Sequence, residues 1–226
     1  MLKLTYYSHS CFLLDNGEHQ IIIDPFLTGN PTAPIKADEV KAKFIVATHA
    51  HGDHLGDSFP IAKANDGTFI AVNELANYAI EEGVTAHNMH LGGGWQFPFG
   101  YLKFTIAHHG SADGKGRYMG NPAGVIIKTG GKTLYHTGDT SLFLDMKLIG
   151  ETNKIDIMTV CIGGNFTMDI DDAVRAVQFV NPEVVIPMHY NTFPVINADP
   201  NEFKSKVEAL GKKCIVMDFN KPVTFE

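Results

Sequence analysis

The chain has 226 residues, 44% of them hydrophobic, and a formal net charge of −7 at pH 7. This length and apolar content suffice for one domain with a substantial core, while the acidic balance argues against an extended nucleic-acid surface, which needs clustered cations. The three scattered cysteines argue against a disulfide framework or a thiolate zinc site, so we expect Cys11, Cys161 and Cys214 to be buried. No basic-then-apolar leader opens the sequence and no apolar run approaches ~18 residues, so we expect a cytoplasmic protein without a membrane partner.

Antiparallel strands open the predicted fold. Residues 2–14 alternate apolar and polar side chains and meet the apolar run 21–23 across an Asn-Gly pair, a strong hairpin signal. His9 is predicted to lie on the first strand, where a histidine considered alone is more often structural than functional. Asp24 ends the run 21–23, so its carboxylate either forms a turn or accepts hydrogen bonds from loop amides and a ligand imidazole.

The next strand, predicted at 44–47, leads into the sequence Thr-His-Ala-His-Gly-Asp-His. A soluble protein has little packing reason to gather three imidazoles and a carboxylate, and a divalent metal is their most economical partner. His49 and His51 point the same way on an extended segment, so they can bind one ion. Asp53 and His54 follow a glycine that lets the backbone turn, and they can aim at a second ion. The alternative is a histidine-rich exposed loop.

A β-α rhythm follows this loop and predicts parallel strands with covering helices. The predicted elements are a helix at 57–64, a strand at 68–72, a helix at 73–81, and a hairpin of residues 95–99 and 101–106.

The second group of ligand candidates follows this hairpin, at His108 and His109. Adjacent residues on a strand point to opposite faces, so at most one of the two imidazoles faces the metals. The loop 111–121 is rich in glycine and charge, which is typical either of a solvated loop or of a substrate wall. Lys115 and Arg117 are its candidates for binding a phosphate or carboxylate group of a substrate.

The rest of the chain again places polar residues after predicted strands. Asp139 follows a hairpin, which repeats the strand-then-carboxylate order of Asp53 and hints at a duplicated half. His189 follows another strand, with Tyr190 and Asn191 beside it as candidate substrate contacts. The predicted strands are 123–128, 132–135, 155–162, 184–187 and 214–219, and the predicted helices are 141–148, 169–180 and 200–210.

The pattern His-x-His-x-Asp-His after a strand resembles the signature of the metallo-β-lactamase superfamily of hydrolases. The stretches Thr-Gly-Asn-Pro at 28–31, Tyr-His-Thr-Gly-Asp-Thr at 135–140 and Pro-Met-His-Tyr-Asn-Thr-Phe-Pro at 187–194 are similar to those of the small UPF0173 metal-dependent hydrolases, nearly end to end. The resemblance implies an α/β fold, a four-layer αβ/βα sandwich with metals at the strand ends. It would form a single domain, 1–226, with two similar halves of roughly 1–120 and 121–226.

The resemblance also implies roles for single residues. It favours His109 over His108 as the ligand, because the family's ligand stands two positions before a serine. It implies that Asp139 bridges two metals, that Asp24 anchors the metal loop, and that His9 supports the metal centre or contacts substrate. A carboxylate that relatives often carry near Gly164 is missing here, and the adjacent Asn165 stays a candidate substrate contact.

The predicted ligands form two sets: His49, His51 and His109 on one ion, and Asp53, His54 and His189 on the other, with Asp139 between them. Nitrogen and oxygen ligands without thiolate suit zinc or manganese, our first expectation, and also iron, cobalt or nickel. Two ions about 3.5–4 Å apart would hold a bridging hydroxide as the nucleophile. Asp53 and His54 are the catalytic candidates, with Asp53 orienting the nucleophile and receiving its proton.

The sequence therefore predicts a binuclear metal-dependent hydrolase that cleaves a small phosphodiester, ester or lactone. One alternative is a non-catalytic metal-binding or sensing module, although none of the seven ligands is missing. Another is an RNA-processing nuclease, which the acidic charge and the lack of an inserted nucleic-acid domain disfavour. The expected partner is a small molecule, and we expect a homo-oligomer because relatives often assemble.

Overall fold

Fourteen strands alternate with short helices along the chain in the computed structural model, which describes residues 1–226. The first sheet contains β1 (Leu2–Tyr6), β2 (Phe12–Asp15), β3 (Gln20–Ile23), β4 (Phe44–Val46), β5 (Thr68–Val72), β6 (Ala86–Met89) and β14 (Val223–Phe225). The second contains β7 (Gly94–Phe97), β8 (Gly100–Ile106), β9 (Ala123–Thr129), β10 (Lys132–His136), β11 (Ile157–Cys161), β12 (Val184–Met188) and β13 (Lys213–Cys214). The helices are η1 (Ala37–Glu39), α1 (Gly52–Leu55), α2 (Ser58–Ala64), α3 (Asn73–Glu81), α4 (Met146–Thr152), α5 (Ile170–Val180), η2 (Pro194–Ile196) and α6 (Pro200–Ala209).

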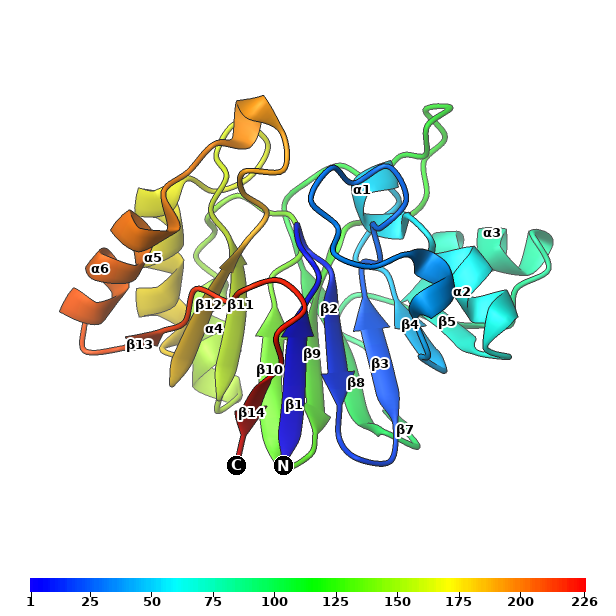
Figure 1. Cartoon of the computed structure of the whole chain (residues 1–226), viewed down its shortest axis with the longest axis horizontal. Helices are drawn as coiled ribbons and strands as arrows, with labels where there is room; N and C mark the ends of the chain where they lie inside the picture. Colours follow the sequence, from blue (N-terminus) through cyan, green and yellow to red (C-terminus); the bar gives the residue numbers. More distant parts are fainter.

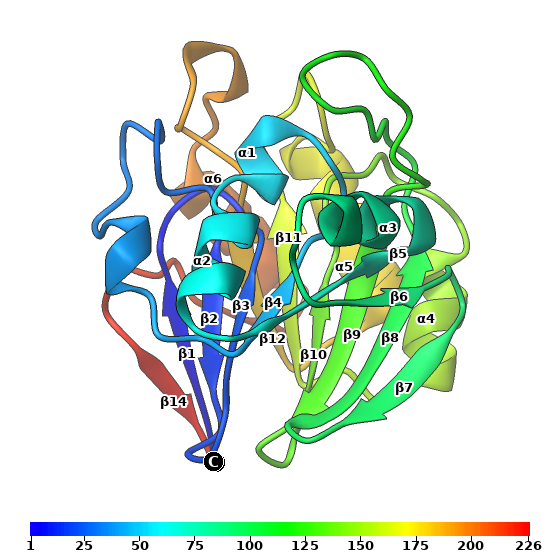
Figure 2. The same ribbon diagram turned by 90° about the vertical axis from the view of Figure 1, so that its right-hand side faces the viewer.

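The two sheets face each other, with helices on their outer sides (Figures 1 and 2). Their orders are β14-β1-β2-β3-β4-β5-β6 and β13-β12-β11-β10-β9-β8-β7. Helices α2 and α3 pack on β4, β5 and β6, while α5 and α6 pack on β11, β12 and β13. This arrangement confirms the predicted four-layer α/β sandwich.

Strand direction decides where the loops gather. β3 to β6 run parallel to one another, and so do β10 to β13. β1 runs in the direction of β3, and β8 in the direction of β10, because each of these pairs is joined through one antiparallel neighbour. The carboxyl ends of these strands therefore lie at one edge of each sheet, the upper edge in Figure 1. Polar residues that follow the strands in sequence thus come close together in space.

The helices begin and end at residues that the sequence supplies for this purpose. At the start of α5, the Asp169 side chain accepts a hydrogen bond from the backbone N–H of Asp172. The helix ends at Asn181, which has a left-handed φ of 54°, and Pro182 follows it. Its buried face consists of Ala173, Ala176, Val177 and Val180. The three cysteines are free and buried, as predicted. None of the helices is both long and apolar enough to cross a membrane.

Two predicted strands are wrong. Residues 2–14 form two strands, β1 and β2, because Ser8 and His9 have positive φ values of 96° and 56°, which no strand accommodates. His9 therefore lies in a turn and not on a strand. The predicted strand 214–219 stops at Cys214, and the chain then returns to the first sheet, where β14 pairs antiparallel with β1.

The change of sheet falls earlier in the chain than residue 120. β6 is the last strand of the first sheet before the crossing, and β7 already belongs to the second. The hairpin of β7 and β8, which the predicted halves assign to residues 1–120, therefore pairs with strands of the second half. The hairpin continues through β9 by antiparallel pairing with β8.

Candidate metal centre

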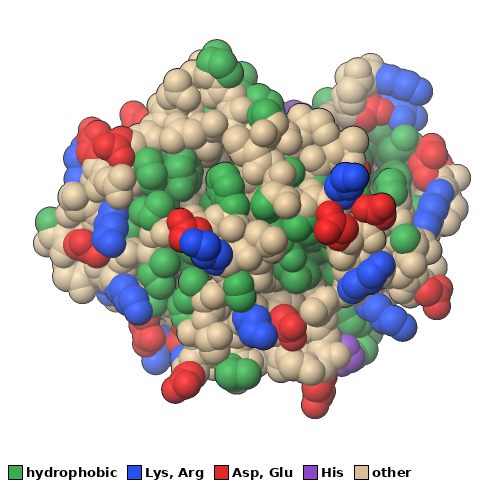
Figure 3. Space-filling view, in the orientation of Figure 1, with side chains coloured by type: hydrophobic (Ala, Val, Ile, Leu, Met, Phe, Trp, Pro, Cys, Tyr) green, Lys and Arg blue, Asp and Glu red, His purple; other side chains and the backbone are tan.

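Six loops at the carboxyl edges of the sheets bring the predicted ligands together. The loops after β1, β3 and β4 carry His9, Asp24 and the histidine-rich segment that continues into α1. The loops after β8, β10 and β12 carry His109, Asp139 and His189. Figure 3 shows histidine atoms in the dip between two raised parts of the molecule at this edge.

One group of imidazoles consists of His49, His51 and His109, whose ligand atoms all lie within 4.8 Å of one another. His49 Nε2 and His51 Nδ1 are 3.0 Å apart. His49 is fully buried, and this burial keeps its pKa well below the usual value, so its ring stays neutral as a metal ligand requires. His108, by contrast, is exposed and its ring lies against Phe143. The structure therefore brings His109, and not His108, to the cluster.

A second group consists of Asp53, His54 and His189, together with His9. The short helix α1 begins directly after His51 and turns Asp53 and His54 away from the extended segment. The rings of His54 and His189 are stacked with centroids 5.5 Å apart. The structure thus brings together the three residues predicted for the second ion, and His9 lies among them.

Asp139 lies between the two groups. Its Oδ2 atom is 3.0 Å from His189 Nε2, 3.3 Å from His54 Nε2 and 3.5 Å from His109 Nε2. The backbone reaches this position through Gly138, which has a positive φ of 59° and lies where an added Cβ would be 2.5 Å from the carbonyl oxygen of Ala123. Only glycine fits this turn, which aims the next residue at the imidazoles.

The hydrogen bonding of this cluster fits a divalent metal. Eight buried side-chain nitrogen and oxygen atoms in the chain have no hydrogen-bond partner, and four of them belong to the cluster. They are His54 Nε2, His189 Nδ1, His189 Nε2 and Asp139 Oδ1. Two nitrogen ligands of one tetrahedral ion at about 2.0–2.1 Å would lie roughly 3.4 Å apart, close to the separations observed here. Imidazole nitrogens and carboxylate oxygens without thiolate are also the donors that zinc and manganese accept.

The electrostatics of the cluster favour positive charge at its centre. Burial disfavours a charged His54, yet Asp139 and Asp24 outweigh this effect and raise the pKa of His54 well above its usual value. Burial likewise favours a neutral Asp139, but His189 and His54 hold its pKa well below the usual range. Both shifts reflect the same attraction between buried carboxylates and positive charge. A cation placed among these carboxylates is therefore stabilised.

Asp24 anchors the histidine-rich loop from below. Its fully buried carboxylate accepts hydrogen bonds from the backbone N–H of Thr48 at 2.8 Å, from the Thr48 hydroxyl at 2.7 Å and from His54 Nδ1 at 2.7 Å. In the neutral ring that a metal ligand requires, the last contact keeps the proton of His54 on Nδ1 and leaves the lone pair of Nε2 for a metal. Asp57, which lies nearby, stabilises the loop backbone: its carboxylate accepts hydrogen bonds from the backbone N–H groups of Leu27 and Thr28.

His9 connects the two halves of the centre. Burial lowers its pKa to about 4, so the ring is neutral at neutral pH. Its Nε2–H donates to Asp53 Oδ2 at 3.2 Å, and its Nδ1 accepts from the hydroxyl of Thr192 at 2.9 Å. Its backbone carbonyl oxygen accepts from the backbone N–H of His189 at 2.7 Å and from the Tyr6 hydroxyl at 2.9 Å. The turn at His9 is thus hydrogen-bonded to Thr192, which lies 183 positions further along the chain.

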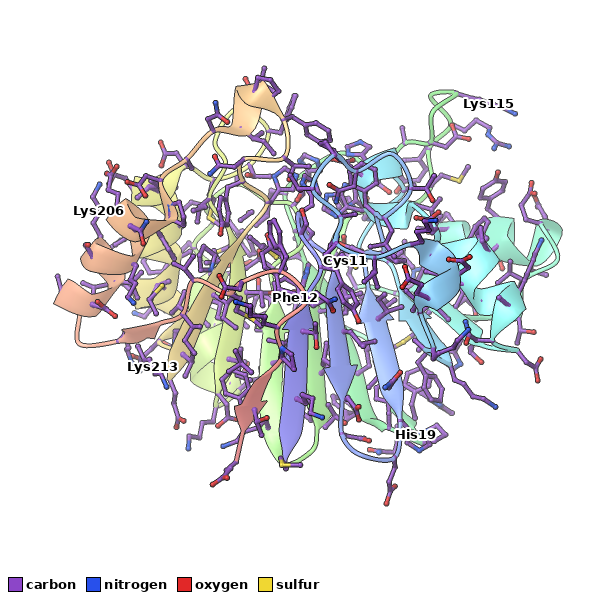
Figure 4. All side chains as sticks on the ribbon, viewed as in Figure 1. Cys11, Phe12, His19, Lys115, Lys206 and Lys213 are labelled. Carbon is purple, nitrogen blue, oxygen red and sulfur yellow. The ribbon has the colours of Figure 1, made fainter.

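The structure keeps the predicted cationic substrate contacts away from the cluster. Lys115 lies at the outer end of its loop and points away from the molecule (Figure 4). Arg117 forms an ion pair with Asp113 at 2.6 Å, and its guanidinium group lies 4.7 Å from the ring centre of Tyr78.

The three uncharged candidates occupy different positions. Asn165 is exposed, with a left-handed φ of 47°. Asn191 Oδ1 accepts the backbone N–H of Ala198, so this side chain closes its own loop. Tyr190 is half-buried, and burial and the nearby Cys214 raise its pKa to about 12.

Sequence reasoning missed two supporting residues, Thr192 and His136. His136 is fully buried; its Nε2–H donates to the carbonyl oxygen of Ser10 and its Nδ1 accepts the backbone N–H of Gly138. It therefore ties the turn that carries His9 to the loop that carries Asp139. The only local indication of this role in the sequence is that His136 stands three residues before Asp139. Its partner Ser10 is 126 positions away, so the contact between them leaves no local pattern.

Comparison with known proteins finds a matching family and similar proteins. Residues 3–189 match the model of the beta-lactamase superfamily domain. A UPF0173 metal-dependent hydrolase of Carboxydothermus hydrogenoformans is 50% identical over 212 residues, which cover 93% of this chain and 94% of that protein. A Bacillus cereus protein with the same family name is 48% identical over 212 residues, 92% of this chain and 93% of that protein.

Solved structures give the same result. Igni18, a metallo hydrolase of the hyperthermophilic archaeon Ignicoccus hospitalis, is 40% identical with a TM-score of 0.93, over 100% of this chain and 98% of that chain. An isothiocyanate hydrolase from Delia radicum gut bacteria shares the fold at 18% identity, with a TM-score of 0.78 and 99% of both chains covered. The chain belongs to the metallo-β-lactamase superfamily and, within it, to the UPF0173 metal-dependent hydrolases.

Proposed function

We propose that this protein is a hydrolase that binds two divalent metal ions and cleaves a small ester, lactone or phosphodiester. The observation that carries the proposal is the convergence of two imidazole-rich groups on the buried carboxylate of Asp139, with ligand atoms that no protein group satisfies. The residues assigned to one ion are His49, His51 and His109, those assigned to the other are Asp53, His54 and His189, and Asp139 is shared. Zinc and manganese are the first choices, and iron, cobalt and nickel suit the same donors.

Metal ions bound here would supply an acidified water and stabilise the negative charge that develops on a carbonyl or phosphoryl oxygen. The chain's own contribution is to orient the reactants and to move the proton. Asp53 is suited to the second task, because its side chain is 30% exposed while His9 holds its Oδ2 atom. Burial favours the neutral acid, but the hydrogen bond from His9 and the charge of His54 hold the pKa of Asp53 below its usual range, so its carboxylate is ionised at neutral pH.

A small-molecule substrate fits this proposal better than a nucleic acid. The net charge of −7 gives no general attraction for phosphate backbones. The two cations of the 111–121 loop do not face the centre, because Lys115 points away from it and Arg117 is already paired.

The test is turnover of chromogenic esters, lactones and phosphodiesters by protein loaded with zinc or with manganese, together with the metal content of each sample. We expect about two ions per chain and hydrolysis of at least one substrate class. The His51→Ala variant should lose one ion and most activity, whereas His90→Ala, which changes an exposed histidine outside the cluster, should keep both.

Two results would contradict the proposal. One is full activity in His51→Ala, which would place the chemistry elsewhere. The other is two bound ions with no turnover of any class, which would favour a metal-binding or sensing module.

A further inference from the structure

Two neighbouring loop segments beside the metal centre contain no charged residue. They are residues 162–168, after β11, and residues 190–198, after β12; each is followed directly by an exposed aspartate, Asp169 or Asp199, that caps the next helix. Each exposes a large apolar side chain, Phe166 with 54% of its surface accessible and Val195 with 58%. Phe193 is half-buried in the second loop. We call these three residues the apolar wall. A single exposed apolar residue needs no explanation, but three on adjoining loop segments at a candidate active site do.

The two loops are packed against each other. A Cβ atom added to Gly163 would lie 2.2 Å from the carbonyl oxygen of His189 and 2.9 Å from Ile196 Cβ, so the loops touch where both leave the sheet. A backbone hydrogen bond from the N–H of Met168 to the carbonyl oxygen of Thr140 joins the first loop to the segment after Asp139. Both loops are thus fixed to segments that carry ligand candidates.

The wall reaches the metal centre through His9. The ring of Phe193 lies 5.5 Å from the ring of His9, which in turn lies 4.1 Å from the ring of His189, measured between centroids. Both views of the ribbon show the 190–198 loop rising above the strand ends on one side, with the 111–121 loop on the other (Figures 1 and 2). The imidazoles of the metal centre lie between these two loops.

The 111–121 loop, on the opposite side of the metal centre, offers no free cation. Arg117 is paired with Asp113, and Lys115 extends outward from the loop tip. The exposed large side chain on that loop is Tyr118, with 65% of its surface accessible. A substrate with an anionic group beside its reacting bond would therefore find no cation on the two loop segments of the apolar wall, and on the 111–121 loop only cations that are paired or point outward.

We propose that the substrate is uncharged next to its scissile bond and carries an apolar group, an alkyl or aryl chain, that lies against Phe166, Phe193 and Val195. This inference rests on the proposed hydrolase function and selects esters and lactones among its substrate classes. In the reaction, the oxygen of water bonds to the carbonyl carbon, the bond from that carbon to the leaving oxygen breaks, and a proton of the water passes to the leaving oxygen.

The test is a series of p-nitrophenyl esters from acetate to octanoate, assayed with the metal-loaded protein. Because each methylene that leaves water gains hydrophobic free energy, kcat/KM should rise about two- to fourfold per added methylene until the wall is covered. In Phe166→Ser and Val195→Ser, kcat/KM should become nearly independent of chain length. The control variants Ile80→Ser, on α3, and Leu210→Ser, directly after α6, remove exposed apolar residues outside the apolar wall and should keep the full chain-length dependence.

A binding measurement separates the inference from the proposed function. Methyl alkyl ketones are uncharged and are not hydrolysed, and their affinity by calorimetry should tighten with chain length in the wild-type protein and not in the wall variants. This result would support the wall even if no ester were turned over. Turnover or binding that does not depend on chain length would overturn the wall while leaving the hydrolase function intact.

Two further outcomes would also overturn it. A preference for anionic phosphodiesters over long-chain esters would show that charge, and not apolar surface, selects the substrate. An oligomer that dissociates in Phe166→Ser, measured by sedimentation velocity, would show that the wall is an interface between copies of the chain.

Discussion

Replacing Asp24 with asparagine should weaken metal binding by changing the protonation site of His54. The carboxylate has two accepting oxygens for three donors, and its Oδ2 atom takes both the Thr48 hydroxyl and His54 Nδ1. An amide nitrogen at that position would itself be a donor facing His54 Nδ1. The imidazole would then have to accept at Nδ1 and carry its proton on Nε2, the atom that faces Asp139.

The magnitude follows from these contacts. Losing one charge-assisted hydrogen bond in a fully buried site costs about 1.5–3 kcal/mol of folding free energy. Loss of a carboxylate that orients a ligand imidazole typically lowers metal affinity about 10- to 100-fold. We therefore expect Asp24→Asn to lower the stability of the metal-free protein and, beyond that, to weaken binding of the ion held by His54.

The assay is competition for zinc with a chromophoric chelator, together with thermal unfolding of the metal-free protein. Asp57→Asn is the matched control, because Asp57 is also a buried carboxylate that accepts loop N–H groups but contacts no imidazole. It should destabilise the fold and leave zinc affinity within about threefold of wild type, well inside the effect expected for Asp24. Equal losses of zinc affinity in both variants, or no loss in Asp24→Asn, would refute the tautomer argument.

Three further predictions concern the ligands and the loop backbone. Asp139→Ala should lower the metal content at both sites, since Oδ2 lies within 3.5 Å of ligand nitrogens from both groups; an unchanged content by elemental analysis would exclude a bridging role. His109→Ala should remove one ion while His108→Ala removes none, and the reverse order would show that the exposed ring is the ligand. Gly56→Ala should destabilise the fold by about 2–4 kcal/mol in thermal melts, because a Cβ atom there would lie 2.5 Å from the carbonyl oxygen of Pro25 at a φ of 41°. Gly83 also has a positive φ but is surrounded by open space, so the control Gly83→Ala should cost only about 1 kcal/mol.

Many features of this protein could be predicted from the sequence because their signals are local. The histidine-rich segment from His49 to His54 follows a short apolar run, and its spacing alone separates two directions of side chains. Helix α5 has its aspartate at the start and its asparagine and proline at the end. The alternation of strands and helices indicates parallel strands, and parallel strands place their following residues at one edge.

Features that depend on contacts between distant segments could not be predicted in this way. The alternating pattern of residues 2–14 hides a turn, because the positive φ values of Ser8 and His9 are held by partners such as Thr192 and His136, far along the chain. The strand β14 leaves its own half because the open edge of β1 offers it an antiparallel partner. Composition alone gives no sign of either contact.

The same division applies to the centre itself. The residue types that can bind metal, and the strand ends on which they stand, are readable from the sequence, since they depend on side-chain chemistry and on periods of two residues. Only the folded chain shows that His109 faces the cluster and His108 does not, that His9 holds Asp53, and that the cations of the 111–121 loop are paired or turned outward. These are matters of orientation across both sheets, and they are fixed only when the loops of both sheets pack together.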